Sequence, residues 1–281
     1  MREIVGTRPR LSALRPGSVP LHLMVFAILI FLLLPTVIVV PMSLNGEQYL
    51  AFPPRSWSLR WYAAYFGDPE WIAATLLSLE VAALTTVAAT VLGTCASLAL
   101  VRSDIGNHGW LNALILAPMI VPHVVIAVAM YLQLAPLGLT GTLSGFVIAH
   151  TVLALPYVVL TVSAALYRLD PALEMAALSL GASRPQAFFG VTLPLILPGV
   201  ATGAAFAFII SLDEAVVSFF ISGVSGKTLP RKLFEDIDYS LSPVIAAAST
   251  LLVTVSLLIM GGIELARRAA ARRLHRTSPS D

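Results

Sequence analysis

Charged residues are scarce in this chain. Asp, Glu, Lys and Arg make up 11% of its 281 residues, whereas 58% are hydrophobic, and the mean hydropathy is +0.88. Soluble globular domains carry about 25% charged residues, so the chain is far too apolar to be one. The composition predicts an all-α, polytopic membrane protein.

Cysteine is nearly absent as well. Cys95 is the only one and lies within an apolar run, so a single chain contains neither a disulfide nor a thiolate metal site. His123 and His150 also lie in apolar runs, without further ligands at helical spacing. We therefore expect histidines that pack inside a helix bundle, and no metal site.

The sequence lacks a nucleotide-binding motif. Gly226-Lys227-Thr228 looks like the end of a P-loop, but the glycine required five positions before Gly226 is Ile221, and no strand precedes it. Protease and hydrolase motifs are missing from the apolar runs. We expect a protein that is not an enzyme and binds no cofactor itself.

Six apolar runs are long enough to cross a membrane, since about 20 helical residues span about 30 Å. The first run is too long for a signal peptide and no cleavage site follows it, which indicates an uncleaved span. The runs cover residues 21–43, 72–101, 109–135, 143–167, 198–222 and 244–264. They predict one transmembrane domain, 21–264, between an N-terminal arm, 1–20, and a C-terminal tail, 265–281.

Positive charge orients these spans. The segments on the side of the two termini hold 12 of the 17 Lys and Arg residues, and the opposite segments hold 5. Because positively charged segments remain in the cytoplasm, both termini and the loop at about 169–197 are predicted to be cytoplasmic. The net charge of +2 comes from these arms, so we expect no nucleic-acid partner.

The loop at 169–197 predicts two short helices. Asp170 and Pro171 form a helix start, and Gly181 supplies a left-handed stop. Ser183 and Gln186 then have the spacing of a capping box.

The second of these helices carries an aromatic surface. Pro185 stands in its first turn, Phe188 and Phe189 follow, and Pro194 is expected to end it after about two turns. A short capped helix with bare aromatic side chains between two spans predicts a docking element at 183–190.

The loop resembles the cytoplasmic coupling loop of the membrane subunits of binding-protein-dependent ABC importers. The shared pattern is A-A-x-x-x-G, about nine residues, and x-L-P, met by Ala176, Ala177, Gly181, Leu193 and Pro194. The segments 211–222 and 228–230 resemble the spermidine/putrescine branch of that family. One position differs, because Met175 stands where most members carry Glu, and Glu174 lies one place earlier.

This resemblance implies a type I ABC importer permease-like fold with six transmembrane helices and a cytoplasmic coupling helix, in the bacterial inner membrane. It implies a pore-forming permease for polyamines or a similar small organic cation. ATP and Mg would be bound by a partner ATPase dimer, with a second permease subunit, expected to be a distinct homologue, and an extracytoplasmic substrate-binding protein. The ATPase-coupling residues expected are Glu174, Ala176, Ala177, Gly181, Ser183, Pro185, Gln186, Phe188, Phe189, Leu193 and Pro194.

Two alternatives stay open. An importer permease of this class can serve another substrate, such as ferric iron, thiamine, a phosphonate or an organic acid. A secondary transporter driven by an ion gradient is a different class, but such proteins commonly show inverted repeats with paired broken helices, and no second half mirrors residues 198–222.

Acidic residues inside the apolar runs mark a candidate substrate pathway, because an ionisable group at membrane depth faces a bundle interior or an aqueous path. Asp213 and Glu214 are the main pair. Neighbouring helical positions point about 100° apart, so we expect Asp213 to face the path and Glu214 to contact a neighbouring helix or subunit. Alternatively, Asp213 caps a helix break or pairs with a partner subunit. Glu80 is a lesser candidate.

The first external segment, 44–71, contains eight aromatic residues. They predict either a belt at the lipid–water interface, which is favoured, or a docking surface for a binding protein. The charged external segment 223–243 either contributes to that surface or is simply solvated.

Overall fold

The structure, a computed structural model, describes residues 19–102, 109–223, 226–239 and 242–276. Its regular secondary structure is helical, apart from one bridge between Asn45 and Trp57. The helices are α1 (Val19–Ser43), α2 (Arg60–Gly67), α3 (Pro69–Arg102), α4 (Gly109–Ile120), α5 (His123–Leu134), α6 (Leu143–Tyr167), α7 (Pro171–Ser179), α8 (Arg184–Ala187), the π-helical turn η2 (Phe188–Thr192), α9 (Leu193–Asp213), α10 (Val216–Ile221), α11 (Leu229–Tyr239) and α12 (Val244–Arg276).

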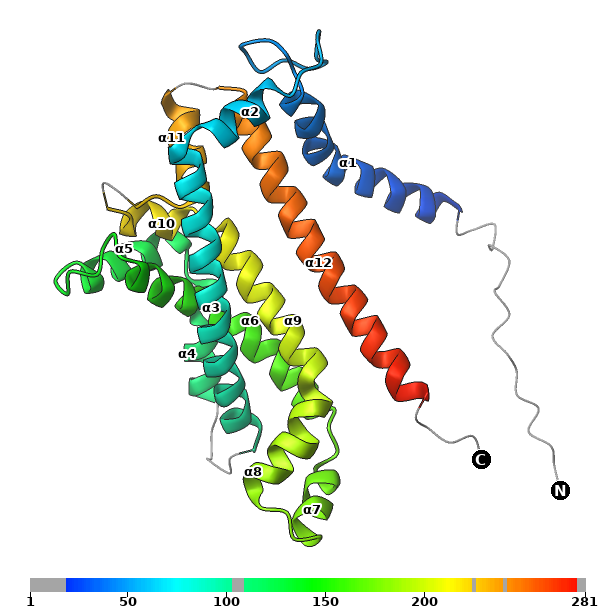
Figure 1. Ribbon diagram of the computed structural model, residues 1–281. Helices are drawn as coiled ribbons and strands as arrows, with labels where there is room; N and C mark the ends of the chain where they lie inside the picture. The colour runs from blue at the N-terminus through cyan, green and yellow to red at the C-terminus, as the bar shows by residue number, and fades with distance from the viewer. Residues whose placement is uncertain (1–18, 103–108, 224–225, 240–241, 277–281) are drawn as a thin grey trace.

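Among the described residues, five helical stretches are long and apolar enough to cross a membrane, and six if α4 and α5 count as one bent span. The fourth predicted run coincides with α6, whereas α12 continues past the predicted end at 264 to Arg276. The predicted arm, 1–20, lies outside the described residues except for its last two. Figure 1 places α2 and α11 at one end of the molecule and α7 and α8 at the other.

The core of the bundle is the contact of α6 with α3 and α9. Val158 of α6 lies between two glycines, Gly93 of α3 and Gly203 of α9. A Cβ atom on Gly93 would lie 2.6 Å from Val158 Cγ1, and one on Gly203 would lie 2.6 Å from Thr161 Oγ1 and 3.1 Å from Val158 Cα. The absence of a side chain at these glycines therefore allows α3 and α9 to approach α6 closely.

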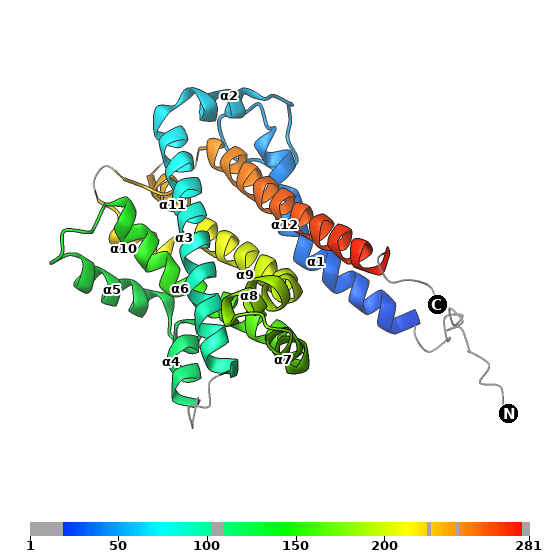
Figure 2. The same ribbon diagram turned by 60° about the horizontal axis from the view of Figure 1, so that its bottom comes forward.

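By contrast, α1 stands apart from this core and contacts α12 near the end where α2 lies, and the two helices diverge away from it (Figure 1). Figure 2 shows the same pair from a second side. The apolar side chains of α1 are exposed, as in a helix that faces lipid.

The prediction of one continuous third span over 109–135 is wrong. The chain breaks at Val121 and Pro122, and the axes of α4 and α5 differ by 105°. Pro122 has no N–H to donate and disfavours helical backbone at the residue before it, so α4 ends there and α5 begins again at His123. In Figure 1, α5 lies crosswise to α3.

The fifth predicted span differs at both of its ends. Pro194 does not end a short helix, because α8, η2 and α9 form one helical stretch from Arg184 to Asp213. The wider π turn carries the helix past Pro194, with the Leu193 N–H bonded to the Phe188 carbonyl. At its other end the stretch stops at Asp213, not at 222, and α10 starts after Glu214 and Ala215.

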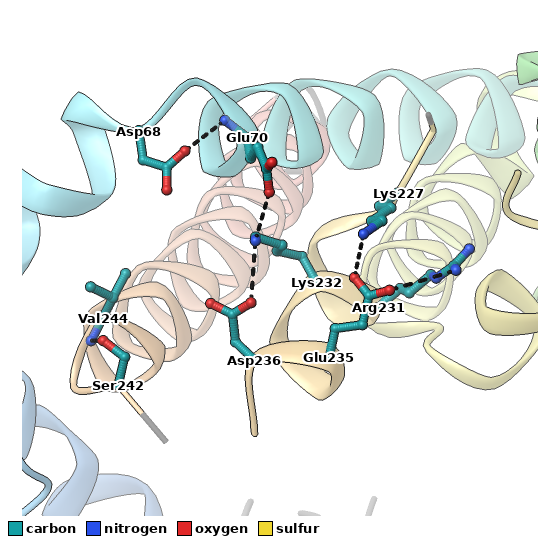
Figure 3. A network of polar contacts seen from close by, with 9 residues as sticks. All are labelled: Asp68, Glu70, Lys227, Arg231, Lys232, Glu235, Asp236, Ser242 and Val244. Carbon is teal, nitrogen blue, oxygen red and sulfur yellow. Dashed lines mark hydrogen bonds and ion pairs between the residues drawn. The ribbon is translucent and has the colours of Figure 1, made fainter. Parts of the chain in front are cut away.

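The described parts of the two segments predicted to be external, 44–71 and 223–243, include the short helices α2 and α11, which the sequence did not indicate. The amide of Leu229, at the start of α11, donates to Ser78 Oγ of α3 at 2.7 Å. Further along α11, Lys232 Nζ donates to Glu70 at 2.9 Å and lies 3.2 Å from Asp236 (Figure 3). Burial opposes the charge of Lys232, but these two contacts outweigh it and raise its pKa above the usual value, so α11 is tied to α3 by a charged lysine.

Candidate functional site

Two helix breaks meet inside the bundle, one between α4 and α5 and one between α9 and α10. The helices that follow the breaks, α5 and α10, pack against each other with buried side chains such as Ile126, Ala127, Val217 and Ile221. Figures 1 and 2 both show them side by side. Non-helical backbone at membrane depth is tolerated where it is buried in protein or lines a water-filled cavity, so this meeting point is the candidate substrate passage.

Glu214 lies in the second break and is 6% exposed. Its Oε1 accepts the amide of Val217 at 2.9 Å, which caps the start of α10. Its Oε2 lies 3.3 Å from Nδ1 of His123, the first residue of α5. The carboxylate of Glu214 therefore joins the two breaks.

Asp213 is the last residue of α9 and, unlike Glu214, its side chain is exposed on the isolated chain. We expected Glu214 to contact a neighbouring helix, and it does so through His123. That Asp213 faces the passage stays a prediction. The cap at the break comes from Glu214, not Asp213. Glu80 is also exposed, on α3.

The two histidines behave differently from one another. His150 of α6 is buried and bonded through both ring nitrogens, to Ser211 and Ser218, as expected for a packed histidine. The side chain of His123 is 49% exposed beside Glu214, so the expectation of a packed histidine is wrong there. Sequence reasoning missed His123 as a site residue, although a polar residue directly after Pro122 was a signal for a helix start. No group of three or more metal-ligating side chains occurs among the described residues.

A second candidate surface lies at the far end of the bundle, on the loop between α6 and α9. Asp170 Oδ1 accepts the amide of Ala172 at 2.9 Å, and Gly181 has φ +90°, which confirms the predicted start and stop of α7. The side chains of Met175 and Leu180 are 62% and 90% exposed. Neither residue was predicted to be part of the coupling surface, because the docking element was predicted at 183–190 from its two phenylalanines.

The predicted free-standing helix at 183–190 is the tip of the 184–213 helical stretch. Its capping box is present, since the Ser183 amide donates to Gln186 Oε1 at 2.8 Å. Phe189 is 65% exposed and Phe188 packs edge-on against it, with ring centroids 5.0 Å apart. Of the other predicted coupling residues, Ala176, Gly181, Ser183, Pro185, Gln186 and Pro194 are exposed, and Ala177 and Leu193 are partly buried.

Glu174 faces inward from α7. Its Oε2 accepts the hydroxyl of Thr192 at 2.8 Å and pairs with the guanidinium of Arg102 at the end of α3. Arg102 also donates to Thr192 at 3.4 Å. The carboxylate thus holds α7 against α3 and η2, and Met175 is the side chain exposed next to the Ala pair.

Comparison with known proteins places the chain among transporters. The family described as "Binding-protein-dependent transport system inner membrane component" matches residues 96–273. The putrescine transport system permease protein PotI of Escherichia coli K12 is 34% identical over 79% of this chain and 82% of its own length. The spermidine/putrescine permease PotC of Haemophilus influenzae is 31% identical over 84% and 91%, and the molybdenum permease ModB of Mycobacterium bovis is 32% identical over 74% and 82%.

Solved structures share the fold. A bacterial ABC transporter that imports the acidic polysaccharide alginate aligns with a TM-score of 0.71 at 15% identity, over 90% of this chain and 96% of that one. The methionine transporter MetNI aligns with a TM-score of 0.57 at 19% identity, over 72% and 99%. With its apolar helical spans, the chain is a multi-pass membrane protein, and it belongs to the family of inner-membrane permease subunits of binding-protein-dependent ABC importers.

Proposed function

We propose that this permease subunit forms one half of the pore of an importer for a polyamine or a similar small organic cation. The observation that carries the proposal is the acidic pair at the junction of two helix breaks, with Glu214 buried between them and Asp213 exposed. A carboxylate in a water-filled route offsets part of the hydration that an ammonium group loses there. The putrescine and spermidine permeases among its relatives support the same class of substrate.

An anionic substrate fits this junction less well. ModB, a relative at 32% identity, carries molybdenum in its name, so an oxyanion importer is the alternative within the family. Exposed acidic groups repel an anion, and Asp213 and Glu80 are exposed acidic side chains within the described spans.

Other subunits supply the energy for transport and deliver the substrate. ATP and Mg are bound by an ATPase dimer, a second permease, expected to be a distinct homologue, completes the pore, and an extracytoplasmic binding protein delivers cargo. The alginate transporter that aligns with this chain was crystallised with its periplasmic protein, which supports that last partner. In the bacterial inner membrane both termini and α7 face the cytoplasm, and α2 and α11 face outward, because the Lys and Arg residues concentrate on the α7 side.

The ATPase docks on the exposed side chains of α7 and on Phe189. These side chains are exposed, and the helices α7 and α8 lie at the end of the molecule opposite α2 and α11 (Figure 1). Closure of the ATPase dimer moves them relative to the spans. Because the tip at 184–192 continues into α9, the movement reaches the junction of the breaks.

Asp213→Asn tests the passage assignment. Uptake of labelled putrescine by proteoliposomes that contain the whole complex should fall about tenfold, because the amide keeps the shape but loses an attraction worth up to about 4 kcal/mol at 4 Å. Co-purification of the ATPase should not change, since Asp213 lies far from α7.

Asp68→Asn is the matched control. It removes one carboxylate at the outer surface yet leaves an oxygen to accept the Glu70 amide at the start of α3, and uptake should stay at the wild-type rate. Wild-type uptake by Asp213→Asn removes that residue from the passage. A wild-type complex that imports molybdate and not putrescine contradicts the proposed substrate.

A further inference from the structure

The break between α9 and α10 is crossed by a chain of hydrogen bonds that runs through another helix. Nδ1 of His150 on α6 lies 2.8 Å from Ser211 Oγ in the last turn of α9. Nε2 of the same ring lies 3.1 Å from Ser218 Oγ on α10. Ser218 in turn donates to the backbone carbonyl of Glu214 at 2.8 Å. One imidazole thus bridges the two helices on either side of the acidic pair.

The directions of two bonds in this chain are fixed. A carbonyl oxygen only accepts, so the single hydroxyl proton of Ser218 is committed to Glu214. Ser218 Oγ must therefore accept from His150, whose Nε2 carries the proton. The other ring nitrogen, Nδ1, shares the second bond of the bridge with Ser211 Oγ.

The surroundings of His150 keep the ring in this orientation. The side chain is 1% exposed, and the ring of Phe146, one helical turn earlier on α6, meets it edge-on with centroids 6.1 Å apart. Ser211 and Ser218 are buried as well. A buried hydrogen-bond network with every member paired specifies one geometry.

We propose that His150 is a positioning residue that fixes the break in the fifth span and so sets the direction of the Asp213 and Glu214 carboxylates. The inference rests on the proposed function, in which that pair serves the passage. Its physical basis is the Glu214 residue itself: the main-chain carbonyl is held by the His150 chain, while the side chain caps α10 and faces His123. Losing the bridge frees the backbone from which both acids project.

His150→Phe and His150→Gln separate bonding from volume. Phe fills the ring's space and removes both hydrogen bonds. Putrescine uptake should fall about tenfold, less than the roughly hundredfold loss that a 1 Å misplacement can cause. Gln offers one donor and one acceptor and should keep uptake within about threefold of wild type. Ser218→Ala breaks the same chain of hydrogen bonds. Ser222→Ala is the control, because it removes the hydroxyl of the residue directly after α10, which donates to the Ser218 main-chain carbonyl and not to His150.

The deciding measurement is the double variant His150→Phe with Asp213→Asn. A residue that acts through the acidic pair adds little once the pair is impaired, so the double variant should take up putrescine about as slowly as Asp213→Asn alone. A loss of about a hundredfold, the product of two independent effects, overturns the inference. If His150→Phe does not accumulate, Ser218→Ala replaces it in the same comparison.

The failure of this inference is distinct from that of the proposed function. If Asp213→Asn alone takes up putrescine at the wild-type rate, the passage assignment falls and the inference falls with it. If Asp213→Asn is impaired and the double effect is multiplicative, or if Ser218→Ala matches Ser222→Ala, only the positioning role is overturned. Wild-type uptake by His150→Phe also overturns it.

Discussion

Replacing Met175 and Leu180 together by Asp is expected to abolish ATP-driven uptake. Both side chains are apolar and largely exposed on α7, where the ATPase is proposed to bury them. Central apolar contacts of an interface are worth about 2 kcal/mol or more each, and a buried unpaired carboxylate adds a further cost. Two such changes should weaken ATPase binding about a thousandfold. Co-purification of the ATPase and uptake by proteoliposomes measure the effect.

Ser179→Asp is the matched control for this pair. Ser179 lies on the same helix and is exposed, so the variant adds charge without removing an apolar contact. Phe188→Ala with Phe189→Ala probes the neighbouring tip and should reduce the coupling of ATP hydrolysis to uptake. Retention of the ATPase at wild-type yield by Met175→Asp/Leu180→Asp would show that α7 is not the docking helix.

Gly203→Leu should prevent the bundle from accumulating in the membrane. A Cβ atom there would lie 3.1 Å from Val158 Cα, and backbone of the packed α6 helix cannot rotate away as a side chain can. Overpacking a core costs about 1–3 kcal/mol, and more where backbone must move. Because α9 also carries the acidic pair at its end, any protein that survives should be unstable to mild heating in detergent and inactive in uptake.

The comparison for this variant is Gly261→Leu. Gly261 also lies in an apolar span, α12, but a Cβ atom on it would meet nothing within 4 Å. Fluorescence-detected gel filtration after a temperature series compares the two variants. Equal amounts and equal thermal profiles for Gly203→Leu and wild type would contradict the close packing of α6 on α9.

Sequence predicted the spans well and their interruptions poorly. Long apolar runs locate α3, α6 and α12 because burial in lipid needs only composition and length. The positions of the prolines do not predict where a helix is interrupted. Pro156 and Pro198 lie inside continuous helices, whereas Pro122 marks a break. Packing decides whether a proline interrupts a helix. At Pro122 the chain turns, and the turn brings α5 into contact with α10.

The candidate site was foreseen at the level of residue types. Acidic groups in an apolar run indicated a passage, and the structure adds the helix end at Asp213 and the partners of Glu214. Those partners come from elements distant in sequence, His123 on α5 among them, and no local pattern records such a pairing.

The coupling loop shows the same limit. Caps at Asp170 and Ser183 were predicted because capping is decided by neighbouring residues. The role of Glu174 was not, because its partners Arg102 and Thr192 are far along the chain. The Glu174 carboxylate is held by Arg102 and Thr192, so the exposed side chain directly before the Ala pair is Met175.

One continuous helical stretch, from Arg184 to Asp213, connects the proposed ATPase-docking surface to the candidate substrate passage. Its 30 residues are about 45 Å long at 1.5 Å per residue, with the proposed ATPase-docking surface at one end and Asp213 at the other. The π turn η2 is the one irregular element within this stretch, so a displacement of its tip is expected to be passed on to Asp213. The helix ends at Asp213, which puts the proposed substrate contact at the point where the chain first leaves helical geometry.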